Sequence, residues 1–149
     1  MRMVSLLAAL VVVAACSGDP VKNLPPGQTA GVAKWTLTTY NGGTLPYSGT
    51  LNANGSVNRV DSGTLTLDDR TRTYLLDIRI VNTLGATTTP QDYSEVGSFA
   101  ANASGGYTFK PNDISGGTDT RAYATVPVSV SGNTLSFPQQ GKTLTFARQ

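Results

Sequence analysis

The sequence predicts an all-β domain of about eight or nine short antiparallel strands, and three features indicate it. Apolar and polar residues alternate in short runs, which is the period of a strand with one buried face. Tight-turn pairs such as Asn54-Gly55 and Gly132-Asn133 separate the runs. Charged residues make up only 13% of the chain, about half of the usual ~25%. Thr, Ser, Gly and Asn, which favour strands and turns over helix interiors, take their place.

Residues 1–15 have the features of a signal peptide. Arg2 and the α-amino group form a short positive region, and residues 4–13 are an apolar run broken only by Ser5. As a helix this run would span about 15 Å, half of the ~30 Å core of a bilayer, so it is too short for a transmembrane anchor. Two small residues, Ala14 and Ala15, follow it, as expected before a cleavage site.

The sequence Val13-Ala14-Ala15-Cys16 resembles the lipobox of bacterial lipoproteins. In that family the cysteine sulfur receives a diacylglyceryl group, cleavage occurs just before it, and the new amino group is acylated. The resemblance therefore implies that Cys16 is the lipidated mature N-terminus and that its chains, palmitate among them, anchor the protein to a membrane. An ordinary secretory signal with a chance cysteine is the alternative. Because Ser17 rather than Asp follows the cysteine, the sorting rule of the family implies the outer membrane of the cell envelope.

Residues 16–31 are expected to form the lipidated cysteine and a flexible tether, and residues 32–149 the single domain. The segment 17–31 contains three prolines and three glycines and few apolar residues, a composition typical of a linker.

The clearest strand covers residues 72–81. Tyr74, Leu76, Ile78 and Ile80 face one side of it, and polar residues including Asp77 and Arg79 face the other. A slip of one residue would bury Asp77 and Arg79, so the register is well specified.

Turn residues divide the rest of the domain into further strands. Asn41-Gly42-Gly43 ends the first strand, and Asn54-Gly55 is the strongest hairpin signal in the chain. Pro127 is expected at an edge or bulge position, with its side chain away from the core. The expected strands cover residues 34–40, 47–53, 56–60 leading into 63–67, 72–81, 93–100, 106–110, 121–131, 134–137 and 142–148.

Two loops are expected, a long Thr-rich one at residues 82–92 and another at 111–119. The second contains Asp113, Ser115 and Asp119, but it lacks the ligand spacing and the terminal glutamate of an EF-hand, so a turn is favoured over a calcium site.

Strands joined in sequence by tight turns favour an up-and-down meander that closes into a barrel, with a β-sandwich as the alternative. Trp35-x-Leu37 before Asn41-Gly42, the hairpins that follow, and the ending Leu144-x-Phe146-x-Arg148 resemble small bacterial lipocalin-like domains. The resemblance implies a small barrel in which Arg148 on the last strand stacks across Trp35 on the first and helps to close it. Lipocalins carry Gly-x-Trp at this strand, whereas Gly31 here lies four residues before Trp35.

Large aromatic side chains are expected on the inner face of the barrel. They would either line an apolar ligand pocket or fill the core, because an eight-stranded barrel is just wide enough for either arrangement. These residues are Trp35, Tyr74, Phe99, Tyr107, Phe109, Phe137 and Phe146.

The composition excludes several function classes. The chain has no histidine, which removes the commonest general base and metal ligand, and a single cysteine cannot form an intrachain disulfide. A net charge of +2 without a basic cluster argues against a nucleic-acid partner. No motif selects Asp77 or Glu95 as catalytic acids. We therefore expect no enzyme activity, no metal and no cofactor.

Three function classes follow from the sequence. The first is a monomeric, lipid-anchored module that binds a small apolar ligand. The second is a protein-interaction or structural envelope module with a filled barrel, whose partner the sequence does not identify. An enzyme is the least favoured.

Overall fold

The computed structural model describes residues 31–116, 124–139 and 141–149. The signal peptide, Cys16 and the tether up to residue 30 lie outside this part of the chain, as do residues 121–123 of one expected strand and residues 117–119 of an expected loop.

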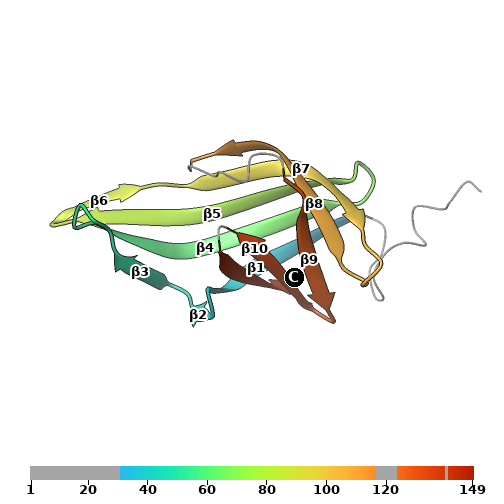
Figure 1. Cartoon of the computed structure of the whole chain (residues 1–149), viewed down its shortest axis with the longest axis horizontal. Helices are drawn as coiled ribbons and strands as arrows, with labels where there is room; N and C mark the ends of the chain where they lie inside the picture. The colour runs from blue at the N-terminus through green and yellow to red at the C-terminus, as the bar shows by residue number, and fades with distance from the viewer. Residues whose placement is uncertain (1–30, 117–123, 140) are drawn as a thin grey trace, which may run out of the picture.

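The described chain is all β (Figure 1). Its strands are β1 Val32–Tyr40, β2 Gly43–Thr44, β3 Tyr47–Leu51, β4 Val57–Asp68, β5 Thr73–Leu84, β6 Thr87–Pro90, β7 Tyr93–Ala101, β8 Tyr107–Ser115, β9 Val126–Ser131, β10 Thr134–Gln139 and β11 Lys142–Arg148.

Eight of these strands form a closed antiparallel barrel, as the meander predicted, and the sandwich alternative is wrong. Each barrel strand pairs with the next one in the sequence order β1, β4, β5, β7, β8, β9, β10 and β11, and β11 then pairs with β1. The three extra strands lie at one end. β3 pairs with the part of β4 that extends beyond β1, and β6 pairs with the part of β5 that extends beyond β7.

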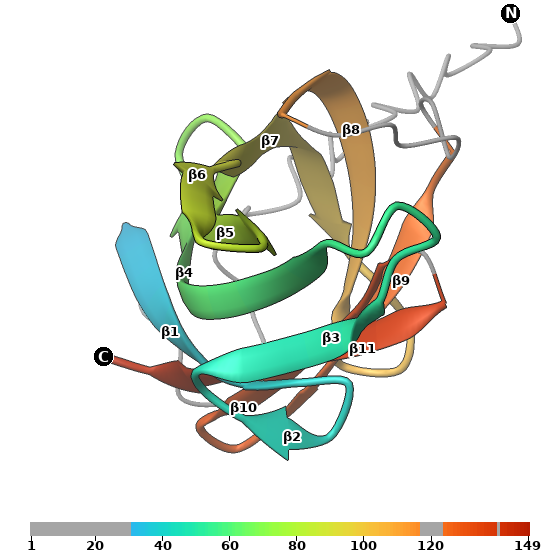
Figure 2. The same cartoon turned by 90° about the vertical axis from the view of Figure 1, so that its left-hand side faces the viewer.

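The two ends of the barrel differ. We call the end that holds Val32, Arg148 and the β4–β5 turn the base, and the end that holds β2, β3 and β6 the mouth (Figure 1). Figure 2 views the barrel from the mouth, with β3 and β6 in front of the ring of strands.

The base is filled by side chains. Alternation of buried and exposed residues holds along β5, where Tyr74, Leu76 and Ile78 are buried and Asp77 and Arg79 exposed, so the predicted register is confirmed. All seven predicted inward aromatics are buried and belong to one continuous hydrophobic core.

Two arginines lie against aromatic rings at the base. Trp35 and Arg148 are paired across β1 and β11, and the Arg148 guanidinium carbon lies 5.9 Å from the Trp35 ring centre. The Arg72 guanidinium carbon lies at the same distance from Phe99. Cation–π contacts therefore join the first strand to the last and the β4–β5 turn to β7.

The predicted loop at residues 82–92 is wrong. β5 continues to Leu84, turns at Gly85 with φ +58°, and returns as β6, so a hairpin extends beyond the barrel. Every β6 residue is exposed. A Thr-rich strand with no buried face lacks the apolar alternation by which strands are recognised in a sequence.

The predicted loop at residues 111–119 is also wrong in its first half, because β8 continues to Ser115. Asn112 is an extra residue in the β7–β8 pairing, since Val96 pairs with Asp113 but Gly97 with Pro111. This bulge interrupts the period of two.

The strand predicted at residues 121–131 begins only at Val126, since Ala124 and Thr125 are exposed and outside any strand. Pro127 is exposed and lies where β9 pairs with β8, whereas β10 pairs with the second half of β9. This half-paired position accommodates a residue that cannot donate a ladder hydrogen bond.

Candidate functional site

A cavity of about 720 Å³ lies at the mouth of the barrel. Its rim is open to solvent, because Thr50, Asn52, Gln91 and Lys142 are exposed, while its floor includes the buried side chains of Ile78 and Tyr93. Its volume is within the range of small-molecule sites. Its described lining is Tyr40, Tyr47, Gly49, Thr50, Asn52, Asn58, Val60, Ile78, Ile80, Gln91, Tyr93, Gly116, Gln139 and Lys142.

Bulges direct several of these side chains into the cavity. In β1 the extra residue Thr38 shifts the inward phase from Trp35 and Leu37 to Tyr40. In β4 the extra residue Asp61 changes the inward-facing positions from Gly63, Leu65 and Leu67 in the base to Val60 at the cavity. Each bulge thus lies between the strand segment that faces the packed base and the segment that faces the mouth.

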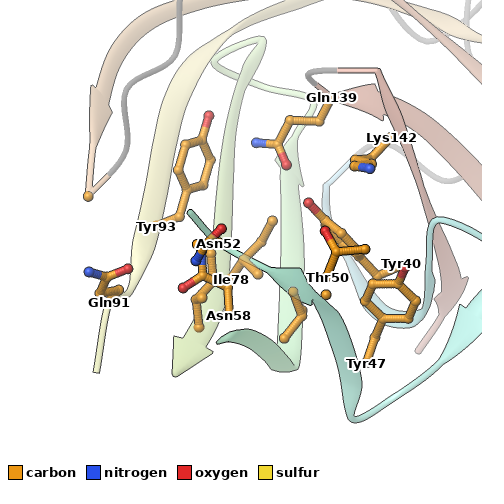
Figure 3. Close-up of a pocket in the computed structure, with 14 residues that line it drawn as sticks. Tyr40, Tyr47, Thr50, Asn52, Asn58, Ile78, Gln91, Tyr93, Gln139 and Lys142 are labelled. Carbon is orange, nitrogen blue, oxygen red and sulfur yellow. The ribbon is translucent and has the colours of Figure 1, made fainter. Parts of the chain in front are cut away.

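Side chains reach the cavity from two sides. Figure 3 shows Gln139, Lys142, Tyr40 and Tyr47 on one side, which β10, β11, β1 and β3 provide. Across from them lie Ile78 and Tyr93, from β5 and β7. Val60 and Ile80 lie next to Ile78 in the β4–β5 pairing and extend this second side as an apolar wall.

Gln139 is the most buried polar side chain of the cavity lining, with 6% of its surface exposed. Figure 3 shows its amide directed into the cavity. Lys142 is paired with Gln139 across the β10–β11 hairpin, so both side chains leave the same face of the sheet. Among the described lining residues Lys142 is the only one with a formal charge.

Tyr40 and Tyr47 form a tilted aromatic pair, with ring centres 5.4 Å apart. Burial raises the pKa of Tyr40 above its ordinary value of 10.0, and the neighbouring Tyr47 phenol raises it further. The Tyr40 phenol is therefore neutral at physiological pH, and the hydroxyl groups of both tyrosines can donate or accept hydrogen bonds at the cavity wall.

Asn52 and Asn58 extend the lining toward the rim. Nδ2 of Asn82 donates to Oδ1 of Asn58 at 2.6 Å across β4 and β5. Nδ2 of Asn52 donates to the Ser56 hydroxyl at 2.9 Å and fixes the preceding turn. These amides are held by protein partners.

A buried carboxylate separates the cavity from the aromatic base. Glu95 is wholly buried and accepts a hydrogen bond at Oε1 from the Tyr74 hydroxyl at 2.5 Å. Its Oε2 accepts another from the hydroxyl of Tyr93, which lines the cavity. Each oxygen of the Glu95 side chain thus has a phenol as hydrogen-bond partner.

None of the seven predicted aromatics lines this cavity. They all lie in the hydrophobic core, where Phe109 contacts four rings. The aromatics of the cavity are instead Tyr40, Tyr47 and Tyr93, which sequence reasoning missed. Glu95 and Gln139 were also missed, although each occupies an inward position of a regular alternation, Tyr93-x-Glu95 and Phe137-x-Gln139.

In the described ranges no group of three or more His, Cys, Asp or Glu side chains is arranged to hold a metal ion. The same part of the chain contains no helix of sufficient length and hydropathy to cross a membrane. Comparison with protein-family models, curated proteins and solved structures finds no match for this chain.

Proposed function

We propose that this domain is a binding module that holds a small, largely apolar ligand in the mouth of the barrel. The observation that carries the proposal is the cavity of about 720 Å³, open at one end of a barrel whose other end is filled by aromatic side chains. A barrel of eight strands can be packed solid. Here part of the interior is open instead, and its lining includes the apolar side chains of Val60, Ile78 and Ile80, which a ligand would contact.

Native mass spectrometry of the chain from Gly27 onward, exported by a bacterial host, tests this proposal. This chain retains every described strand and every described cavity residue. The expected result is a discrete added mass that is lost on denaturation. A clean apo mass, unchanged after incubation with a lipid extract of the host, would contradict binding of a small apolar ligand.

We propose further that the protein is a monomeric lipoprotein of the cell envelope, anchored at Cys16 and sorted to the outer membrane. The support is the lipobox resemblance of Val13-Ala14-Ala15-Cys16 and the serine that follows it. Two or more acyl chains would give stable anchoring. Intact-mass measurement of the membrane-bound protein should show a lipidated N-terminus at Cys16. Cys16→Ala should abolish the modification, and an unmodified cysteine in the native chain would refute it.

An interaction module is the second candidate, and the exposed surface at the mouth favours it. Leu84 and Leu51 are 51% and 69% exposed, and β6 presents an outer edge for which no strand partner is recorded among the described residues. Crosslinking at Leu84 in native envelopes, with an outward residue of the base such as Lys110 as the control site, would test it. Specific capture of one envelope protein at Leu84 alone supports this alternative. Equal labelling at both sites argues against it.

We assign binding and no reaction to the domain. Turnover of an ester, peptide or glycoside by the purified chain, lost on substitution of a cavity residue, would contradict this assignment.

A further inference from the structure

We propose that the ligand is an amphipathic organic anion, oriented with its acidic group against Gln139 and Lys142 and its apolar body against the wall of Val60, Ile78 and Ile80. The inference rests on the proposed binding function and specifies its ligand class. It follows from the side chains at the cavity, where Gln139 and Lys142 lie across from Ile78 (Figure 3).

The amide of Gln139 lies on the wall of the cavity and is directed into it (Figure 3). The nitrogen of an amide donates hydrogen bonds and its oxygen accepts them. A ligand oxygen at this position would accept a hydrogen bond from the Gln139 amide.

A positive charge lies beside that amide. Lys142 faces Gln139 across the hairpin and carries the only formal charge among the described lining residues. An ammonium group only donates hydrogen bonds, and the amide nitrogen of Gln139 also donates. Two donors, one of them cationic, match an acceptor-only group such as a carboxylate or sulfonate.

Three apolar side chains form a wall of the cavity. Val60 and Ile80 are a direct cross-strand pair, and Ile78 lies two residues before Ile80 in β5 on the same face. All three belong to the lining, and Figure 3 shows Ile78 across from Gln139 and Lys142. A ligand that contacts both this wall and Lys142 must be polar at one end and apolar at the other.

Two fluorescent probes that differ by one acidic group test this inference. They are 8-anilinonaphthalene-1-sulfonate and its neutral parent N-phenyl-1-naphthylamine, titrated into the chain from Gly27 onward. We expect the anionic probe to bind about tenfold more tightly, which is the range of a charge-assisted hydrogen bond. This preference should fall with added salt, because Lys142 is exposed and its field is screened.

Variants separate the two sides of the cavity. Lys142→Gln and Gln139→Leu should each weaken binding of the anionic probe by about three- to tenfold and leave the neutral probe within about twofold. Ile80→Asn should weaken both probes. Lys110→Gln removes an exposed charge from the outer surface of β8 and serves as the matched control, with no effect on either probe. Thermal melts identify any variant that fails to fold. If Gln139→Leu does not fold, Lys142→Gln still tests the inference, because Lys142 is exposed and its substitution does not disturb the core.

The possible outcomes are distinct. Preference for the anionic probe that disappears in Lys142→Gln supports the inference. Equal binding of both probes, unchanged in Lys142→Gln but weakened in Ile80→Asn, overturns the anionic ligand and leaves the binding function standing. Failure of both probes to bind the folded native chain overturns both proposals for ligands of this size.

Discussion

Truncation of Phe109 to alanine should destabilise the domain more than any substitution at the cavity. Phe109 is wholly buried at the centre of the base. Its ring centre lies 4.3 Å from Tyr74, 5.6 Å from Phe137, 6.0 Å from Phe99 and 6.1 Å from Tyr107. Removal of the ring deletes contacts with all four neighbours and leaves a cavity that β-strands on every side prevent from collapsing.

The expected loss can be stated from this geometry. A buried Phe→Ala change costs about 3–5 kcal/mol, and the surrounding rings place Phe109 near the middle of that range or above it. For a domain of about 120 residues, about 4 kcal/mol lowers Tm by about 15 °C. Phe109→Leu keeps most of the apolar volume and should cost only about 1–1.5 kcal/mol, or about 5 °C.

Calorimetry or circular dichroism melts of the two variants measure the effect. Thr108→Ala, at the neighbouring half-buried position on the other face of β8, is the control and should shift Tm by less than about 2 °C. A loss below about 1 kcal/mol in Phe109→Ala would refute a close-packed base. Probe binding measured well below Tm should be unchanged, because Phe109 does not line the cavity. Loss of binding in a folded variant would show that base and mouth are coupled.

Three further substitutions test the remaining structural assignments. Arg148→Gln should cost about 0.5–1 kcal/mol in urea unfolding followed by emission of Trp35, the only tryptophan, and an unchanged midpoint would exclude a stabilising cation–π contact. Tyr47→Phe should lower the pKa of Tyr40 toward 10.0 without reaching it in a ¹³C NMR titration, because burial is the larger cause and remains. By the same shift, the stability that neutral Tyr40 contributes is complete below pH about 10 and is lost as pH rises through its raised pKa. Gly97→Ala places Cβ 2.3 Å from a backbone carbonyl oxygen and should cost about 2 kcal/mol or more in thermal melts, whereas a neutral result would contradict the close strand approach.

The barrel could be predicted because its packed half obeys the simplest strand pattern. Along β5 one face is apolar and the other polar from Tyr74 to Arg79, so only one register buries the correct side chains. Tight turns at Asn54-Gly55 and Gly132-Asn133 impose sequential antiparallel neighbours. Closure itself depends on the β1–β11 and β1–β4 pairings, which are contacts distant in sequence that local patterns do not contain.

The hairpin at the mouth could not be predicted in the same way. β6 is exposed along its whole length, and its threonines alternate with nothing apolar. Its pairing with β5 comes from backbone hydrogen bonds that any sequence without an interior proline can make, so the segment resembles a polar loop.

Several lining residues of the cavity could not be predicted for a related reason, because bulges change which residues of a strand face inward. Extrapolation of the base alternation past Thr38 would point Thr39 inward, whereas Tyr40 lines the cavity. Extrapolation past Asp61 would likewise miss Val60. A bulge shifts the inward phase by one residue, and nothing in the local composition reports the shift. Two strands carry one inward phase from the base into the mouth. In β5 the series that begins at Tyr74 continues to Ile78 and Ile80, which line the cavity. In β10 the series Leu135, Phe137 and Gln139 ends on a polar residue at the cavity. An amide at a position that alternation assigns to the core is therefore a sequence signal by which this cavity could have been found.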